Sequence, residues 1–450
     1  MKKAVCLFLC LLPLWLPAAA PAVLKVSDNQ RYLVDAAGKP FFYLADTAWE
    51  LFHRLNEEDA ELYLSARAKQ GFTVIQCVVL AECDGLRVPN ANGDLPLTDC
   101  DPAKPNEAYF RHVDRVIGRM QSHGLVAGLL PTWGDKWNQA WGKGPAVFTP
   151  ENARAYGEFL GRRYRDKPVI WILGGDRPVK DDAHRAIIAN MADGLRAGDG
   201  GRHPITFHPS GQQQSSQYFH DAPWLSFNMS QTGHARAATN YAFIARDYAR
   251  APAKPCLDGE PGYEDHPNGF QVENGWLGPH DARRNAYWAV FSGACGHTYG
   301  CHAVWQMWEP GRTPINSPLT SWRDALRLPG AEQMHHLRAL VEARPYLTRI
   351  PDQALLRRGP KELWKHIAVT SDRTPGQQNA TFVMAYFPYP AEAVFDTAVL
   401  GKPRIRLAWF DPRTGATHDA GVRDNTGELK IAPPLELHPA DWVLVLTGEG

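Results

Sequence analysis

Two carboxyl side chains, Asp176 and Glu260, each follow a short apolar run in the sequence. Asp176 ends the segment Ile170-Trp171-Ile172-Leu173-Gly174-Gly175-Asp176, and Glu260 lies in Cys256-Leu257-Asp258-Gly259-Glu260-Pro261. Each run is typical of a buried β-strand, the fourth and the seventh of eight along the chain. In an eight-stranded β/α barrel the active site lies at the carboxyl ends of the strands. One acid that donates a proton and one that attacks a sugar carbon can break a glycosidic bond.

Each of these two acids has a simpler structural interpretation and local rivals. Asp176 could cap the next helix or pair with Arg177, and Glu260 could be a solvated loop carboxylate. Asp258 lies earlier in the same strand and Glu264 lies further out on the loop. The position at the strand end favours Asp176 and Glu260 as the catalytic pair.

Other predicted strand ends also carry polar or aromatic side chains. A sugar-binding site needs hydrogen-bond partners together with flat apolar faces, and this set supplies both. Trp133, Trp137 and Trp308 are candidate stacking platforms, whereas a single Trp is more often part of a core. Trp141 and His234 lie slightly further along the chain. The predicted substrate-binding residues are Asp46, Trp49, Glu82, Trp133, Asp135, Trp137, His208, Asn228, Gln306 and Trp308.

Strands and helices alternate through residues 23–350, after a short hairpin at residues 24–34 that we expect to close the bottom of the barrel. Near-continuous apolar strands in one direction favour a parallel (β/α)8 TIM barrel over an open sheet. Asn56, Thr149 and Asp181 are expected at helix starts, and Gly71 and Gly124 at helix ends. The predicted strands are 41–45, 73–80, 126–130, 169–173, 204–207, 224–227, 256–258 and 297–304; the main predicted helices are 56–70, 107–123, 181–197 and 331–343.

The pattern changes after Pro351. Short apolar strands recur between turns without a helix signal, at 364–369, 380–387, 394–399, 405–410, 429–431 and 442–446. Asp411-Pro412-Arg413-Thr414-Gly415 is a strong turn. Residues 351–450 are therefore predicted to form a small antiparallel β-sandwich domain.

The first 22 residues have the features of an export signal. Lys2 and Lys3 precede an apolar run too short to span a bilayer, and Ala18-Ala19-Ala20-Pro21-Ala22 offers a cleavage site. Cys10 is only a weak candidate for a lipoprotein anchor, because Leu9 before it is not small. We therefore expect a protein exported to the periplasm or the extracellular space, without a membrane domain in its mature form.

Charge excludes some partners. The 450 residues carry 48 basic and 48 acidic side chains, with no basic run. This balance argues against nucleic acid or an anionic membrane as the main partner. The oligomeric state stays open.

Six cysteines remain after removal of the signal. Cys83 with Cys100 and Cys295 with Cys301 are plausible disulfide pairs in an exported protein, although spacing does not fix connectivity. Cys77 and Cys256 lie within strand patterns and are expected to be buried thiols.

Several segments resemble the apiosidase-like glycoside hydrolases over nearly the whole mature chain. They are Tyr43-Leu44-Ala45-Asp46-Thr47-Ala48-Trp49-Glu50-Leu51-Phe52, Gly71-Phe72-Thr73-Val74-Ile75-Gln76, Trp171-Ile172-Leu173-Gly174-Gly175-Asp176 and Glu260-Pro261-Gly262-Tyr263-Glu264. Ala408-Trp409-Phe410-Asp411-Pro412-Arg413-Thr414-Gly415 resembles the collagen-binding-type β domain often attached to them. The resemblance implies a (β/α)8 hydrolase of a plant or bacterial polysaccharide or oligosaccharide, possessing Asp176 as acid/base and Glu260 as nucleophile, in a family where one branch cleaves apiose linkages.

Two other classes of function compete with this one. A non-catalytic carbohydrate-binding or adhesive protein would not need both acids. A metal-dependent barrel hydrolase is suggested by the 17 His residues, but the first strand carries no His-x-His and no HExxH is present. We therefore expect no metal and no organic cofactor.

Overall fold

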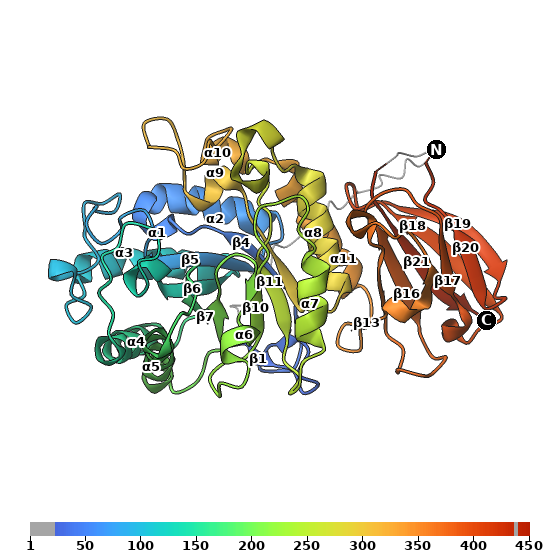
Figure 1. Ribbon diagram of the computed structural model, residues 1–450, viewed down its shortest axis with the longest axis horizontal. Coiled ribbons are helices and arrows are strands. Elements are labelled where there is room, and N and C mark those ends of the chain that lie inside the picture. The colour runs from blue at the N-terminus through green and yellow to red at the C-terminus, as the bar shows by residue number, and fades with distance from the viewer. Residues whose placement is uncertain (1–22, 436–439) are drawn as a thin grey trace, which may run out of the picture.

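The computed structural model describes residues 23–435 and 440–450. The predicted signal peptide, residues 1–22, lies outside the described residues. An N-terminal α/β part is followed by an all-β part, and the two lie side by side (Figure 1).

The chain begins with a small antiparallel sheet of three short strands. It consists of β1 (Lys25–Val26), β2 (Leu33–Val34) and β3 (Pro40–Phe41), in that order. Because β3 is separated from β4 (Tyr43–Thr47) only by Phe42, this sheet lies at the amino-terminal end of that strand. The predicted hairpin is thus present at the end opposite the carboxyl termini of the strands.

A curled parallel sheet forms the centre of the N-terminal part. Its six strands run in the order β12-β4-β5-β6-β7-β8, and a second sheet, β11-β10-β9, lies beside β8. The strands are buried along their length because helices cover the outer face. Their bounds are β5 Val74–Leu80, β6 Val126–Thr132, β7 Val169–Gly174, β8 Ile205–His208, β9 Gln213–Gln214, β10 Asn228–Gln231, β11 Cys256–Glu260 and β12 Gly296–Tyr299.

The helix starts agree with the capping residues in the sequence. Asn56 accepts a hydrogen bond from Asp59 N, Thr149 from Asn152 N, and Asp181 from His184 N. The helices of this part are α1 Leu51–Arg54, α2 Glu57–Lys69, α3 Glu107–Ser122, α4 Pro150–Tyr164, α5 Asp182–Asp199, α6 Ser216–Phe219, α7 Asn240–Tyr248, α8 Pro279–Phe291, α9 His302–Trp305, α10 Trp322–Ala325 and α11 Pro329–Glu342.

Two predicted strands are misplaced. The sixth was expected at 224–227, but β10 occupies Asn228–Gln231, so Asn228 begins the strand instead of following it. The eighth was expected to reach Val304, but β12 ends at Tyr299 and α9 begins at His302. Both errors have one cause: apolar residues outside the strands were taken for strand, while the buried strand Asn228-Met229-Ser230-Gln231 is largely polar.

The C-terminal part consists of antiparallel sheets, as predicted. A six-stranded sheet, β13-β15-β16-β21-β18-β19, and a three-stranded sheet, β14-β17-β20, share one apolar core. The exposed strand β19 was missed because its sequence, THDAGVRD, carries no apolar alternation. The bounds are β13 Ile350–Pro351, β14 Leu356–Arg358, β15 Ala368–Ser371, β16 Phe382–Phe387, β17 Ala393–Asp396, β18 Arg404–Phe410, β19 Thr417–Asp424, β20 Glu428–Ile431 and β21 Trp442–Glu449.

Neither predicted disulfide is present, since all six described cysteines are free thiols. Cys295 and Cys301 lie at opposite ends of β12. Three steps along an extended strand already cover about 10 Å, whereas bridged cysteines have Cα atoms less than about 7 Å apart. Cys77 and Cys256 are buried thiols, as predicted.

One face of α8 joins the two parts. Arg283 binds Asp441 through two hydrogen bonds, 2.7 and 3.0 Å long. The ring of Tyr287 stacks on Tyr386 with centroids 4.8 Å apart, and Trp288 Nε1 donates to His366 O. Within the described residues, none of the helices has the length and apolar character that crossing a membrane requires.

Replacing Arg283 by Ala should strongly destabilise the C-terminal part. Asp441 is fully buried. Within the described residues, only the Tyr386 hydroxyl would still donate a hydrogen bond to it without the Arg283 guanidinium. Leaving a buried charge unpaired costs about 3–5 kcal/mol, which urea unfolding would measure.

Arg357→Ala is the matched control, because Arg357 pairs with Asp396 at an exposed site. Its cost should stay under about 1 kcal/mol. Equal, small losses in both variants would contradict the role given to Arg283.

Candidate functional site

A cavity of about 840 Å³ opens at the carboxyl ends of the parallel strands. Seven strands contribute a lining residue at or within two positions of their ends. The polar and aromatic lining residues are Trp49, Glu82, Trp133, Trp141, Asp176, Ser210, Gln212, Gln231, His234, Glu260, Tyr263, His266, Phe270, Trp305 and Asn316.

The end of β7 turns sharply and brings Asp176 to the cavity. Gly174 and Gly175 both have φ +96°. A Cβ on Gly174 would lie 2.3 Å from His208 O, and one on Gly175 would lie 2.7 Å from Gly134 N, so neighbouring backbone leaves room only for glycine. Asp176 itself has φ +54°, a conformation uncommon for a residue with a side chain. The close approach of three strand ends therefore fixes this carboxyl.

The surroundings of Asp176 favour retention of its proton on balance. Burial and the nearby negative charge of Glu260 raise its pKa to about 6, against the lowering effect of Arg177 and His208. Trp141 Nε1 and Arg177 Nη1 donate to Asp176 Oδ2 over 3.3 and 3.2 Å. A carboxyl with this pKa can act as a general acid.

A β-bulge at Gly259 aims Glu260 into the cavity. Ser230 pairs with Asp258 and Gln231 pairs with Glu260, so Gly259 is an extra residue in β11. In a regular strand without a bulge, Asp258 and Glu260 would point to the same face of the sheet, because side chains alternate along a strand. A Cβ on Gly259 would lie 2.4 Å from Met229 Sδ, so any side chain at this position would require Met229 to move.

Glu260 has the opposite electrostatic environment. Its Oε2 lies 3.0 Å from His208 Nε2, and its Oε1 lies 3.1 Å from His234 Nε2. Burial alone would raise the pKa of Glu260, but the hydrogen bonds and electrostatic attraction of His208 and His234 lower it to about 2. The side chain is therefore held as a carboxylate, the form that a nucleophile requires.

The two rival acids lie elsewhere. Asp258 points away from the cavity and accepts hydrogen bonds from Thr232 and Asn240. Glu264 accepts hydrogen bonds from the Tyr299 hydroxyl and from Gly330 N in the first turn of α11, so its side chain caps that helix. Neither side chain lines the cavity.

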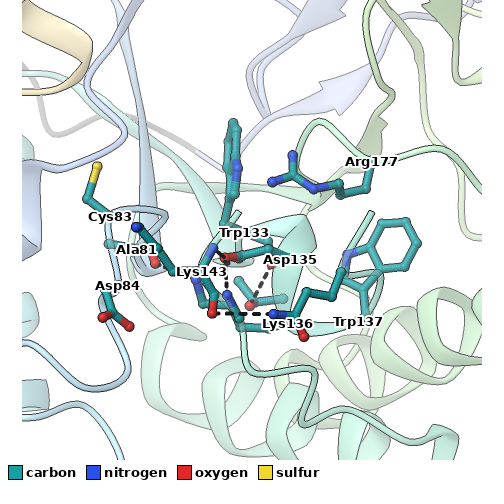
Figure 2. A network of polar contacts seen from close by, with 12 residues as sticks. Ala81, Cys83, Asp84, Trp133, Asp135, Lys136, Trp137, Lys143 and Arg177 are labelled. Atoms are coloured by element: carbon teal, nitrogen blue, oxygen red, sulfur yellow. Dashed lines mark hydrogen bonds and ion pairs between the residues drawn. The ribbon is translucent and has the colours of Figure 1, made fainter. Parts of the chain in front are cut away.

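A buried ion pair holds the segment that carries Trp141. Lys136 Nζ donates to Asp135 Oδ1 and to Ala81 O, over 2.6 and 2.7 Å. Asp135 Oδ2 accepts from the amides of Lys143 and Gly144. Figure 2 shows this network with Trp133, Trp137 and Arg177 around it. The pair thus links the ends of β5 and β6 to the far side of the 134–144 loop.

Besides the two acids, three of the predicted site residues line the cavity: Trp49, Glu82 and Trp133. The rings of Trp49 and Trp133 lie 5.1 Å apart, and Trp49 also contacts the ring of His208 edge-on. These aromatic faces form one wall, where a sugar ring could stack.

Four predicted residues lie behind this lining. His208 contacts Glu260, and Asp135 belongs to the loop network. Trp137 donates to Gly174 O below Asp176. Gln306 bonds to the backbone of Ile315, which positions the segment carrying Asn316.

The structure does not bring the last three predicted residues to the cavity. Asp46 is buried in an ion pair with Arg67, 2.6 Å long. Asn228 contacts His220 at the start of β10, and Trp308 donates to Arg312 O. The shifted bounds of β10 and β12 account for the placement of Asn228 and Trp308.

Several lining residues were not predicted. Gln231 was missed because the strand was placed four residues too early. His234, His266 and Phe270 form a cluster of rings beside Glu260, with centroids 4.2–5.5 Å apart. The only sequence signal for them is their place in the loops that follow β10 and β11.

Within residues 23–435 and 440–450, no three His, Cys, Asp or Glu side chains are grouped so that they could hold a metal ion.

The chain was compared with known proteins. The family described as "Apiosidase-like, catalytic domain" matches residues 27–348, and "Putative collagen-binding domain of a collagenase" matches residues 350–447. No curated protein matches the chain.

Two solved structures are similar over nearly their whole length. One, titled a glycoside hydrolase, is 31% identical with a TM-score of 0.85, covering 95% of this chain and 97% of its own. The other, titled a glycoside hydrolase family 5 from Bacteroides vulgatus ATCC 8482, is 30% identical with a TM-score of 0.86, covering 94% and 93%.

Replacing Asp135 by Ala should destabilise the fold by about 3–5 kcal/mol, because Lys136 would keep its buried charge without a counter-ion. Glu342→Ala, which breaks the exposed pair with Arg338, should cost under about 1 kcal/mol. Chemical unfolding measures both. A loss in Asp135→Ala no greater than in this control would contradict the role of the pair.

Proposed function

The chain belongs to the apiosidase-like glycoside hydrolases, and we propose that it is an exported, retaining enzyme in which Asp176 is the acid/base and Glu260 the nucleophile. The observation that carries this proposal is the contrast between the two acids of one cavity. Asp176 has a pKa raised to about 6, whereas the pKa of Glu260 is lowered to about 2. Opposite environments of this kind separate the acid from the nucleophile in glycosidases.

The reaction proceeds in two steps. Asp176 gives its proton to the leaving oxygen while a Glu260 oxygen attacks the anomeric carbon, which forms a glycosyl ester and releases the alcohol. Asp176, now ionised, takes a proton from water, and the water oxygen displaces Glu260 from the anomeric carbon. His208 and His234 hold Glu260 as a carboxylate before attack and after release.

The substrate of the proposal is a plant or bacterial polysaccharide or oligosaccharide with an apiofuranosyl or other pentofuranosyl residue at the scissile bond. Family membership supports this class, since the matching family is described as apiosidase-like. The wall of Trp49 and Trp133 supports stacking of a sugar ring. A panel of 4-nitrophenyl glycosides, including the apiofuranoside, arabinofuranoside and xylopyranoside, tests the assignment, with polysaccharide digests beside it.

We also propose that residues 23–350 form a closed (β/α)8 catalytic domain and residues 351–450 an accessory domain. Hydrogen bonds between the ends of the two sheets, near β8 and β10 and near β11 and β12, support closure. Ser226 N donates to Ile205 O before β10, and Cys295 N donates to Cys256 O before β12, both within 2.9 Å. The export signal at residues 1–22 supports secretion.

Glu260→Gln should lower kcat at least about 10³-fold because an amide cannot form the glycosyl ester. Asp176→Asn should remove the general acid, typically about 10²–10⁴-fold, with less loss on substrates whose leaving group needs no proton. Steady-state kinetics on 4-nitrophenyl and natural leaving groups separate these effects.

Azide should restore turnover in a Glu260→Ala variant, giving a glycosyl azide of inverted configuration at the anomeric carbon. Wild-type activity in Glu260→Gln would contradict the assignment of the nucleophile. Product of inverted configuration from the wild-type enzyme would contradict the retaining mechanism.

The pH profile of kcat/KM should be bell-shaped. Activity requires ionised Glu260, so it rises with pH through a pKa of about 2, and it requires protonated Asp176, so it falls through about 6. Activity at pH 8 should therefore be about 100-fold below the plateau near pH 4, since each unit above the pKa costs tenfold. Asp176→Asn should lose the alkaline limb, and persistence of that limb would contradict its assignment to Asp176.

A further inference from the structure

Glu82 is a third carboxyl group in the cavity, beside the two acids of the proposed mechanism. It lies two residues beyond the end of β5 and shares the lining with Trp49, Trp133 and Asp176. No step of the mechanism uses it.

The three carboxyl groups differ in the partners that the fold gives them. Glu260 contacts two imidazoles, and Asp176 receives N–H donors from Trp141 and Arg177. In the described part of the chain, by contrast, the Glu82 side chain takes part in no hydrogen bond or ion pair. A polar group that is largely withdrawn from water without a partner is free to bind a ligand.

The charges around Glu82 are mostly negative. Asp176, Glu50 and Asp135 repel a carboxylate there, and Arg177 attracts it. The Arg177 guanidinium is already engaged by Trp141 O and Asp176. Burial, followed by the charge of Asp176, raises the pKa of Glu82 to about 8. Geometry and charge together keep the proton on Glu82 at the pH where Asp176 acts as an acid.

We propose that Glu82 is a specificity-determining residue that binds the substrate as an un-ionised acid, donating its O–H to a hydroxyl oxygen of the sugar held between Asp176 and Glu260. This inference rests on the proposed function and deepens it. The carbonyl oxygen of the same group accepts the hydroxyl proton of the sugar, so that one uncharged carboxyl makes two hydrogen bonds.

The rest of the lining agrees with an uncharged sugar at this place. Within the described residues the cavity wall contains three carboxyl groups and no Lys or Arg. A glycosyl residue carrying a carboxylate would meet the negative charge of Glu260 there, without a Lys or Arg in the lining to pair with. Glu82 therefore favours a hydroxyl and disfavours an acid group on the sugar.

Two variants with side chains of similar length test whether Glu82 acts as an uncharged hydrogen-bonding group. Glu82→Gln keeps one donor and one acceptor, as in the un-ionised acid, and Glu82→Met keeps the volume without them. On the 4-nitrophenyl glycoside that the wild-type enzyme cleaves fastest, at pH 5, Glu82→Gln should keep kcat/KM within about threefold. Glu82→Met should lose about 10- to 100-fold, because a buried sugar hydroxyl stays unpaired.

A readout without substrate tests the protonation state itself. Difference infrared spectroscopy of wild type against Glu82→Gln at pH 7 should show the carbonyl band of an un-ionised carboxylic acid in wild type alone. A carboxylate band there instead would overturn the proposal even if no glycoside of the panel is cleaved.

The kinetic outcomes also distinguish this inference from the proposed function. Equal, large losses in Glu82→Gln and Glu82→Met would overturn the role of Glu82 while leaving Asp176 and Glu260 in place. Loss of turnover in Glu82→Gln together with an active Asp176→Asn would instead make Glu82 the acid/base and overturn the proposed function. Equal activity of Glu82→Met and wild type would show that Glu82 does not bind the sugar.

Discussion

The arrangement of the cavity depends on a single extra residue in β11. Alternation along a strand would send Asp258 and Glu260 to the same face, and Asp258 faces the helix α7, where Asn240 binds it. The bulge at Gly259 reverses the direction of the next side chain, so Glu260 meets His208 and His234. Glycine fits there beside Met229, whose side chain would have to move to admit a Cβ. One local irregularity thereby sets the position of the proposed nucleophile.

The groups around Glu260, Asp176 and Glu82 give these three neighbouring carboxyl groups different pKa values. Two imidazoles hold Glu260 ionised, while the repulsion of that charge helps to keep a proton on Asp176. Glu82, which has no side-chain hydrogen-bond partner among the described residues, experiences the repulsion of Asp176, the buried Glu50 and Asp135. Carboxyl groups at close range cannot all be ionised, so the negative charge resides on the group with the strongest hydrogen-bond donors.

Much of this could be predicted from the sequence, for identifiable reasons. Asp176 and Glu260 follow apolar strands that only a buried sheet explains, and Asn56, Thr149 and Asp181 carry local capping signals. The contact of His234 with Glu260 could not be predicted, because it depends on the relative positions of a loop and a strand end that are 26 residues apart in the chain. Nor could β10, whose polar residues are buried by partners distant in sequence. Asp46 shows the limit of the strand-end rule, since it follows the pattern and yet binds Arg67 beneath the site.

The cavity wall formed by the described residues contains carboxyl groups and no Lys or Arg, which has a consequence for inhibition. An oxocarbenium-like transition state gains positive charge at the sugar ring, and the wall stabilises that charge. An iminosugar, whose ring nitrogen carries a full positive charge when protonated, imitates the same distribution. The electrostatic field that stabilises the transition state therefore also favours binding of cationic sugar mimics over their neutral counterparts.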